Sequence, residues 1–316
     1  MILPFESYYL NQKYMKKLIV LLAAICVLSP AFSQSQKLEY KLKKGETYQQ
    51  NAVVESMVKQ TVMGQVVEIS SSNIINMNIT VLEENASGYK LSASIKKMAV
   101  TTNIPSMGTS IVYSTEDDAP VTANTKGVSD ILKGLKDTPF TMEMTRRGEV
   151  TTVQGINAIV TKMITAANLN DAESALLNQT MSQIMTDESY QAQMKQMMMT
   201  YPDKALKLGE TWTQQSKITT TMTLDVETTY KVQSISEKAI VIVAEAVIAA
   251  KEQGMEVSGV AAIVNMDGKQ EGTITIDPTT GWIVSSTAKQ DVKGQIEVQG
   301  MSVPMEIKNI VTVTDK

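Results

Sequence analysis

The stretches "LKKGETYQQ" at residues 42–50 and "LKLGETWTQ" at residues 206–214 carry the same pattern twice in one chain. Six of the nine positions are identical, and a seventh pairs Tyr48 with Trp212. Each stretch places a glycine, Gly45 or Gly209, between a short lead-in and a run of strand-favouring residues. The repeat predicts a duplicated β unit, in which a lead-in strand, a glycine turn and a long strand follow one another.

A second pair of turns supports the duplication. "MTRRGEV" at 144–150 and "TIDPTTGW" at 275–282 both carry a glycine suited to a positive φ, and Pro278 suits the first turn position. The spacing between the two landmarks is longer in the first half of the chain than in the second. We assign the excess residues to an insertion at 105–139, with a short helix at 129–136.

Alternating apolar and polar residues predict antiparallel strands with one buried face and one face exposed to solvent. The longest alternation runs from Ile218 to Val232, with Met222 among its apolar positions, and predicts one long strand. Shorter alternations occur at 75–81, 296–298 and 305–313. Three related glycine sequences predict hairpin connections: "MGQVV" at 63–67, "QGMEV" at 253–257 and "QGMSV" at 299–303.

Three apolar series with helical spacing lie between the two β units. A capping box at Asn170 and Glu173 predicts one helix start, and Pro202 ends the set. The predicted class is therefore α+β, with two related antiparallel β units, at 34–154 and 203–316, and a helical segment at 155–202. Each unit is expected to be a curled sheet or half-barrel, and periodicity leaves open whether they form one sheet or two.

Residues 15–33, "MKKLIVLLAAICVLSPAFS", have the cationic start, apolar run and small-residue end of a secretory signal peptide. We predict cleavage after Ser33 and a periplasmic or secreted product. Residues 1–14 precede a complete leader, so Met15 is an alternative start. The apolar run is too short for a membrane span, which needs about 20 residues, and Ile25 before Cys26 does not fit a lipid-attachment motif.

The composition excludes several kinds of site. The chain has no histidine and a single cysteine, Cys26, inside the predicted leader, so Cys/His metal sites and Ser-His-Asp or Cys-His catalysis are not available. A net charge of −4 argues against nucleic-acid binding. The acidic loop at Glu116, Asp117 and Asp118 is typical of a solvated cluster. We therefore predict a protein that is not an enzyme and has no cofactor or metal.

The methionine-rich stretch "MKQMMMTY" has the spacing of one helical face, which favours core packing over a Cu(I) site. Two functions remain open. In the first, the protein binds a lipid or other hydrophobic ligand; in the second, it is a structural or interaction protein of the cell envelope without a ligand. The residues predicted to line the apolar ligand cavity are Met181, Ile184, Met194, Met197 and Met198.

The order of these motifs resembles a family of secreted Bacteroidota proteins defined only as a domain of unknown function. The resemblance rests on "LKKGETY", "GEVTTVQGINAIV", "YPDKALKLGETWT" and "IDPTTGWIVSS" and covers almost all of the chain after the leader. More distantly, the expected architecture is similar to the lipoprotein-carrier fold, a curled antiparallel sheet with helices against its concave side. That resemblance implies an apolar cavity for acyl chains, although the arginine of the carriers has no matching position here.

Overall fold

The computed structural model describes residues 35–62, 64–219, 223–257 and 260–316. The predicted leader and its cleavage site lie outside these residues. The elements are, in chain order, β1 (Gln36–Lys37), β2 (Thr47–Val62), β3 (Gln65–Glu84), β4 (Gly88–Ile104), η1 (Pro105–Met107), β5 (Thr109–Ser114), α2 (Ala123–Lys133), β6 (Phe140–Thr145), β7 (Val150–Gln154), α3 (Ile156–Ala167), α4 (Asp171–Ile184), α5 (Asp187–Met197), β8 (Ala205–Leu206), β9 (Thr211–Thr219), β10 (Thr223–Ile235), β11 (Ile240–Val257), β12 (Val260–Ile276), β13 (Ile283–Val298) and β14 (Met301–Thr314).

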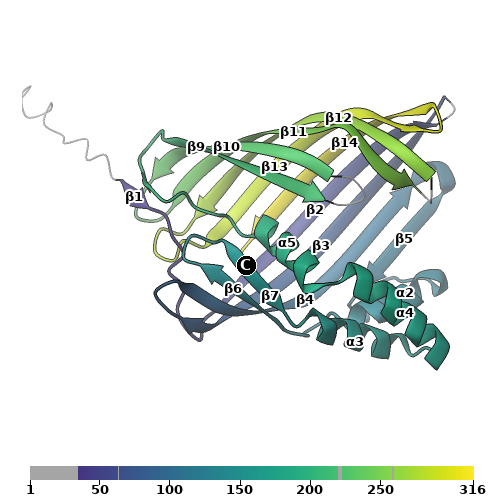
Figure 1. Ribbon diagram of the computed structural model, residues 1–316, viewed down its shortest axis with the longest axis horizontal. Helices are drawn as coiled ribbons and strands as arrows, with labels where there is room; N and C mark the ends of the chain where they lie inside the picture. Colours follow the sequence, from purple (N-terminus) through teal and green to yellow (C-terminus); the bar gives the residue numbers. More distant parts are fainter. Residues whose placement is uncertain (1–34, 63, 220–222, 258–259) are drawn as a thin grey trace, which may run out of the picture. The chain divides into compact units, whose positions relative to one another are not determined.

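Twelve strands form one antiparallel sheet in the order β7-β6-β4-β3-β2-β14-β13-β12-β11-β10-β9, with β5 also paired to β4. The sheet curls, and the helices lie against its concave side (Figure 1). The α+β class is confirmed. The two halves of the chain share a single sheet because β14, the last strand, pairs with β2 from Met305–Gln60 to Thr314–Asn51.

The strands form because every second side chain along them is buried away from water. In β11 the even positions from Ile240 to Ala250 are all buried, whereas the odd positions between them are exposed or partly exposed. Cross-strand partners in an antiparallel ladder point to the same face. The buried series therefore defines the concave face of every strand paired to β11, directly or through neighbours.

The two glycine turns of the repeat are equivalent. Gly45 has a φ of +85° and donates its N–H to Val81, while Gly209 has a φ of +80° and donates to Val232. In each case the next residue, Glu46 or Glu210, donates back across the turn and accepts from the same valine. The repeated sequence thus forms the same hydrogen-bonded structure twice.

In the second pair of glycine turns, each turn packs against the other half of the chain. The turn at Gly281, in the second half, lies against the lead-in of the first half, where Lys41 donates to the carbonyl of Thr280 at 2.7 Å. The turn at Gly148, in the first half, lies against the segment before β8, where Tyr201 donates to Arg147 at 2.8 Å. Each half therefore depends on the other for its packing.

Helices occupy the insertion and the middle segment, as predicted, with one difference in length. The insertion helix begins at Ala123, well before the expected residue 129, with a capping box at Thr122. The predicted capping box of Asn170 and Glu173 is confirmed at the start of α4. α2 packs on β5 and α3, α3 on β6, and α5 on β7. No helix in the described part of the chain is long and apolar enough to cross a membrane.

The prediction of one long strand from Ile218 to Val232 is wrong. These residues belong to a hairpin, in which Thr219 at the end of β9 pairs with Thr223 at the start of β10. The inward residues of both strands fall on even positions, so the alternation continues through the turn and does not mark it. Met222 lies outside the described residues.

The predicted connection at 253–257 is also wrong. Gln253, Gly254 and Met255 pair with Val264, Ile263 and Ala262 inside the β11–β12 ladder. The ladder shifts register between Ala250 and Gln253, and a glycine within a strand often marks such a bulge. The other two predicted connections are confirmed, since Gly64 and Gly300 lie between paired strands with a φ of +79° each.

Candidate functional site

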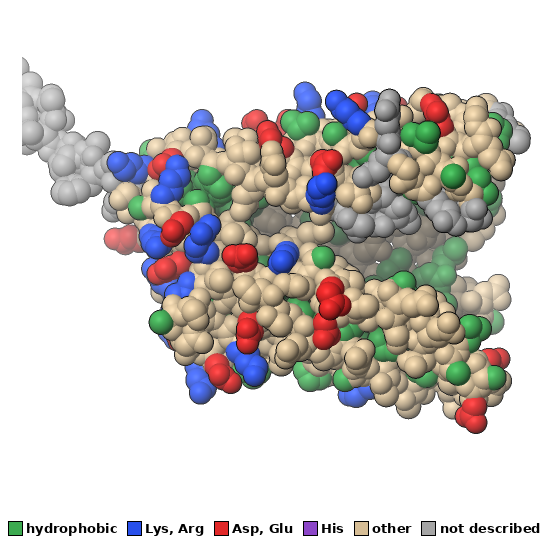
Figure 2. Space-filling view, in the orientation of Figure 1, with side chains coloured by type: hydrophobic (Ala, Val, Ile, Leu, Met, Phe, Trp, Pro, Cys, Tyr) green, Lys and Arg blue, Asp and Glu red, His purple; other side chains and the backbone are tan. Residues whose placement is uncertain are grey.

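The concave face of the sheet carries no charge on five of its central strands. On β2, β10, β12, β13 and β14 every described acidic or basic side chain occupies an outward position of the ladder. Charged side chains accordingly appear on the outside of the molecule in Figure 2. These outward residues are Glu55, Lys59, Asp225, Glu227, Lys231, Asp267, Lys269, Glu271, Lys289, Asp291, Lys293, Glu297, Glu306 and Lys308.

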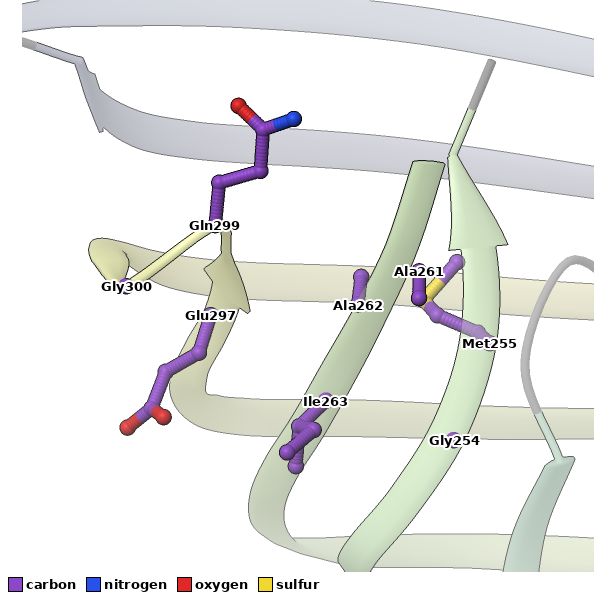
Figure 3. Close-up of a pocket in the computed structure, with 8 residues that line it drawn as sticks. All are labelled: Gly254, Met255, Ala261, Ala262, Ile263, Glu297, Gln299 and Gly300. Atoms are coloured by element: carbon purple, nitrogen blue, oxygen red, sulfur yellow. The ribbon is translucent and has the colours of Figure 1, made fainter. Parts of the chain in front are cut away.

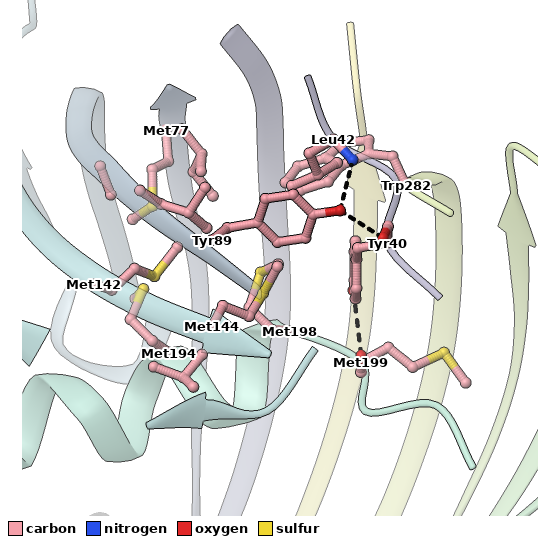
Figure 4. Close-up of a cluster of buried hydrophobic side chains, with 14 of the residues drawn as sticks. Tyr40, Leu42, Met77, Tyr89, Met142, Met144, Met194, Met198, Met199 and Trp282 are labelled. Atoms are coloured by element: carbon pink, nitrogen blue, oxygen red, sulfur yellow. Dashed lines mark hydrogen bonds between the residues drawn. The ribbon is translucent and has the colours of Figure 1, made fainter. Parts of the chain in front are cut away.

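Near the glycine turns, the concave face is filled by the main hydrophobic core. Methionines from strands β3 and β6 meet methionines from the helical segment there (Figure 4). Met194 and Met198, two of the predicted cavity residues, are 3% and 4% exposed and belong to this core. Met181 and Met197 pack against it in part, whereas Ile184 is 62% exposed. The structure thus brings four of the five predicted residues to the core and leaves one outside.

A second group of apolar side chains lies at the other end of the same strands, far from the turns at Gly45 and Gly209. We call it the distal cluster, and every one of its members is a strand residue. Its buried members are Val226, Ala246, Ile248, Ala250, Val264, Met266, Val292 and Met305. No helix in the described part of the chain contributes to this cluster.

The floor of the concave face remains partly open beside the distal cluster. Val58 on β2 and Ile307 on β14 are cross-strand partners that pack against the cluster and stay partly exposed. Ile69 on β3, the partner of Val58, is also partly exposed. Figure 2 shows the molecule hollowed between the β9–β10 side and the helical side. The result is an uncharged, apolar surface that water can reach.

A pocket of about 690 Å³ lies at the tips of the β11–β12 and β13–β14 hairpins (Figure 3). Its residues Gly254, Ala261, Ile263 and Glu297 occupy outward positions of the ladder, whereas Met255 and Ala262 face the concave side, so the pocket lies at the rim of the sheet. A second pocket, of about 530 Å³, lies by strands β9 to β11 and includes the charged residues Lys217, Asp225 and Glu227. None of the five predicted cavity residues lines either pocket, and their assignment to a ligand site stays a prediction.

The acidic loop is held by lysines of the insertion. Nζ of Lys136 lies 2.9 Å from Oε1 of Glu116, and Nζ of Lys133 lies 2.7 Å from Oδ1 of Asp117. These contacts lower the pKa of both carboxyl groups. Across the described ranges, no group of three or more His, Cys, Asp or Glu side chains could hold a metal ion.

Both tryptophans pack against the sheet beside a tyrosine. Trp282 donates its indole N–H to the carbonyl of Gln49 at 3.2 Å and lies against Tyr48, with ring centroids 5.0 Å apart. Trp212 stacks on Tyr230, with centroids 5.0 Å apart and an interplanar angle of 17°. The tryptophan of the repeat, Trp212, thus anchors the start of β9.

The sequence analysis missed a set of inward amide side chains: Gln270, Gln290 and Asn309. The available signal was a polar residue at an inward position of an otherwise apolar alternation, as at Asn309 between Ile307 and Val311. Each such residue looks ordinary alone, because a single polar residue in a strand has many explanations. Only the register of three strands shows that they lie side by side.

The fold and the concave face define a protein with a curled antiparallel sheet whose inner side is apolar and uncharged. The model of the family of unknown function DUF6263 matches residues 86–283, and the chain belongs to this family. This confirms the predicted resemblance to a family without an assigned function. A comparison with curated proteins found no match.

Among solved structures, one concerning lipid–protein interactions in lipovitellin is similar over 87% of this chain, with 12% identity and a TM-score of 0.47. The likeness spans only a quarter, 25%, of the lipovitellin chain. An outer membrane channel from Pseudomonas putida F1 is similar over 91% of this chain and 99% of its own, with 11% identity and a TM-score of 0.27. Both TM-scores are below 0.5.

Proposed function

We propose that this protein binds a lipid or other hydrophobic ligand without catalysis, on the open part of its concave face beside the distal cluster. The observation that carries the proposal is the absence of charge on the concave side of β2, β10, β12, β13 and β14, combined with inward apolar side chains that stay partly exposed, such as Val58 and Ile307. Sites for hydrophobic ligands are concave and mostly apolar, with a few polar groups.

The alternative function, a structural or interaction protein of the envelope without a ligand, is less well supported by this geometry. A protein that acts only through its outer surface has no need for accessible apolar side chains on its inner face, and burial of such side chains stabilises a fold by about 25 cal/mol per Å². The main core shows that the chain can fill part of the sheet with helices. The distal cluster has no such helix within the described residues.

Native mass spectrometry of protein purified from its own cells tests the proposal. We expect a co-purifying hydrophobic small molecule on the wild type and its loss in Ile307→Asp, which puts a charge on the concave face. Ile310→Asp is the matched control, because Ile310 lies on the same strand but is 44% exposed on the outer face. Protein that is always free of ligand, or equal occupancy in the two variants, would contradict ligand binding on this face.

We also propose that the protein is exported, on the basis of the leader at residues 15–33. Cleavage after Ser33 gives a product that begins at Gln34. The intact mass of the protein from its own cells is expected to match that start. An uncleaved leader, or a lipid-modified Cys26 at the new N-terminus, would overturn the proposal.

A further inference from the structure

A row of polar side chains crosses the concave face between the main core and the distal cluster. Its members are direct cross-strand partners on nine successive strands, so the row runs perpendicular to the strands. Ala246, on β11, is its one apolar member and also belongs to the distal cluster, which the row borders. From β9 to β4 the row consists of Gln214, Thr228, Ala246, Gln270, Gln290, Asn309, Ser56, Ser71 and Thr102.

The amides in the centre of the row form a directed chain of hydrogen bonds. Asn309 donates its Nδ2–H to Oε1 of Gln290 at 2.8 Å, and Gln290 donates its Nε2–H to Oε1 of Gln270. The chain ends at Oδ1 of Asn309, which is buried and has no hydrogen-bond partner in the structure. This oxygen is shielded from solvent, whereas Asn309 as a whole is partly exposed on the concave face, so a head group that displaces the neighbouring side chains can donate to it.

Packing does not explain why these positions are polar. On either side along β14, the neighbouring inward residues are Ile307 and Val311, and along β13 they are Ala288 and Val292. Apolar side chains of similar size at the amide positions would extend the same apolar surface without leaving an unpaired acceptor. The row thus reduces the apolar area of the sheet and requires a different explanation.

We propose that the polar row is the head-group site for a neutral amphiphile, with a hydroxyl or amide N–H that donates to Oδ1 of Asn309 and a chain that lies over Val58, Ile307 and the distal cluster. This inference rests on the proposed function and specifies its ligand class. The head group is neutral because the concave side of strands β2 and β12 to β14 holds no cation to pair with a carboxylate or phosphate. An unpaired charge in such a place is strongly unfavourable.

Three probes with the same lauroyl chain separate the contributions of chain, charge and donor. 1-Monolauroylglycerol has hydroxyl donors, methyl laurate has only acceptors, and laurate at pH 8 carries a negative charge. Binding to the full chain is measured by native mass spectrometry and calorimetry. We expect the glyceride to bind about fivefold more tightly than the ester, the difference that one hydrogen bond of typical strength gives, and laurate to bind most weakly.

Gln290→Leu and Asn309→Leu test the row itself. In Asn309→Leu, which removes the acceptor, the ratio of glyceride to ester affinity is expected to fall toward one. In Gln290→Leu, which removes the partner that holds the Asn309 amide in place, the ratio is expected to fall in part. The affinity for the ester is expected to be unchanged or increased in both variants. Gln49→Leu is the control, because the Gln49 side chain is exposed on the outer face of β2, and it is expected to keep the wild-type ratio. Thermal unfolding of each variant shows whether the row is needed for folding.

The outcomes separate this inference from the proposed function. If wild-type protein binds none of the three probes, both are overturned. If it binds the ester and the glyceride equally, or if both leucine variants keep the wild-type ratio, hydrophobic binding stands and the head-group site is overturned. Lower thermal stability of the leucine variants with an unchanged ratio likewise assigns the row a purely structural role and overturns the head-group site.

Discussion

Tyr89 joins three segments of the chain through one hydroxyl group. It donates to the carbonyl of Tyr40 at 2.7 Å and accepts from the N–H of Leu42 at 3.2 Å (Figure 4). It also accepts from Nη1 of Arg146 at 2.9 Å. Arg146 also pairs with Glu84, at 3.0 Å. A tyrosine supplies both the apolar ring and the polar tip that a buried junction of this kind requires.

Tyr190, on α5, is buried without that kind of network, and burial alone raises its pKa to about 12. Its ring lies edge-on to Phe140, with centroids 5.7 Å apart. The folded protein keeps this proton above pH 10, whereas the unfolded chain loses it near pH 10, so stability falls as pH rises above 10.

Tyr190→Phe removes this contribution. We expect the free energy of unfolding to differ little from wild type at pH 8 and to fall less steeply above pH 10, so that the difference from wild type grows by about 1–1.5 kcal/mol by pH 11. Denaturant unfolding at pH 8, 10 and 11 measures the difference. Parallel curves for the two proteins would show that Tyr190 does not titrate differently in the folded state.

At the scale of elements, α4 has the weakest support in the helical segment. None of its residues is buried, and its principal partner is α3. Its first turn is held by a capping box, in which Asn170 accepts from the N–H of Glu173 at 3.0 Å and Glu173 accepts from the N–H of Asn170 at 3.3 Å. Local interactions therefore account for much of its stability.

Asn170→Ala is expected to destabilise α4 by about 1 kcal/mol, the usual effect of losing an N-cap side chain. Hydrogen exchange should increase along α4 and stay unchanged in β3 and β12. Asn178→Ala, an exposed change inside the same helix, is the control and should not increase exchange, because alanine has the higher helix propensity. Equal exchange in the two variants would argue that α3, not the cap, holds the helix.

At the scale of the whole sheet, the glycine turns at Gly148 and Gly281 connect the two halves of the chain. A Cβ atom on Gly281 would lie 2.1 Å from the carbonyl oxygen of Glu39, and one on Gly148 would lie 2.2 Å from that of Met199. Both neighbours are backbone atoms of the opposite half. The close approach explains why these turns contain glycine, apart from their positive φ values.

We expect Gly281→Ala and Gly148→Ala each to lower the free energy of unfolding by about 3 kcal/mol or more, since a positive φ and overpacking act together. Gly45→Ala separates the two effects. Gly45 also has a positive φ, but a Cβ there has open space, so about 1 kcal/mol of loss is expected. Chemical denaturation measures all three, and equal losses would show that the contact between the two halves contributes nothing.

Signals between residues close together in the sequence were enough to predict the helical segment and the repeated turn. Helical spacing and the Asn170 capping box located α3 to α5, and the glycines at 45, 64, 148, 209, 281 and 300 marked turns, because these signals depend on residues close together in the chain. The sequence by itself did not reveal the β9–β10 hairpin, because the inward residues of both strands fall on even positions. It also placed a connection at 253–257, where Gly254 pairs with Ile263 inside the β11–β12 ladder beside the register shift between Ala250 and Gln253.

The tertiary structure alone decided how these elements combine. The pairing of β14 with β2 makes one sheet from two units, and it joins residues more than two hundred positions apart. Pairing also fixed the register that sets Gln270, Gln290 and Asn309 side by side, and alternation along one strand cannot specify its offset from the next. The concave face and its polar row follow from that register, because pairing places the inward side chains of neighbouring strands next to one another.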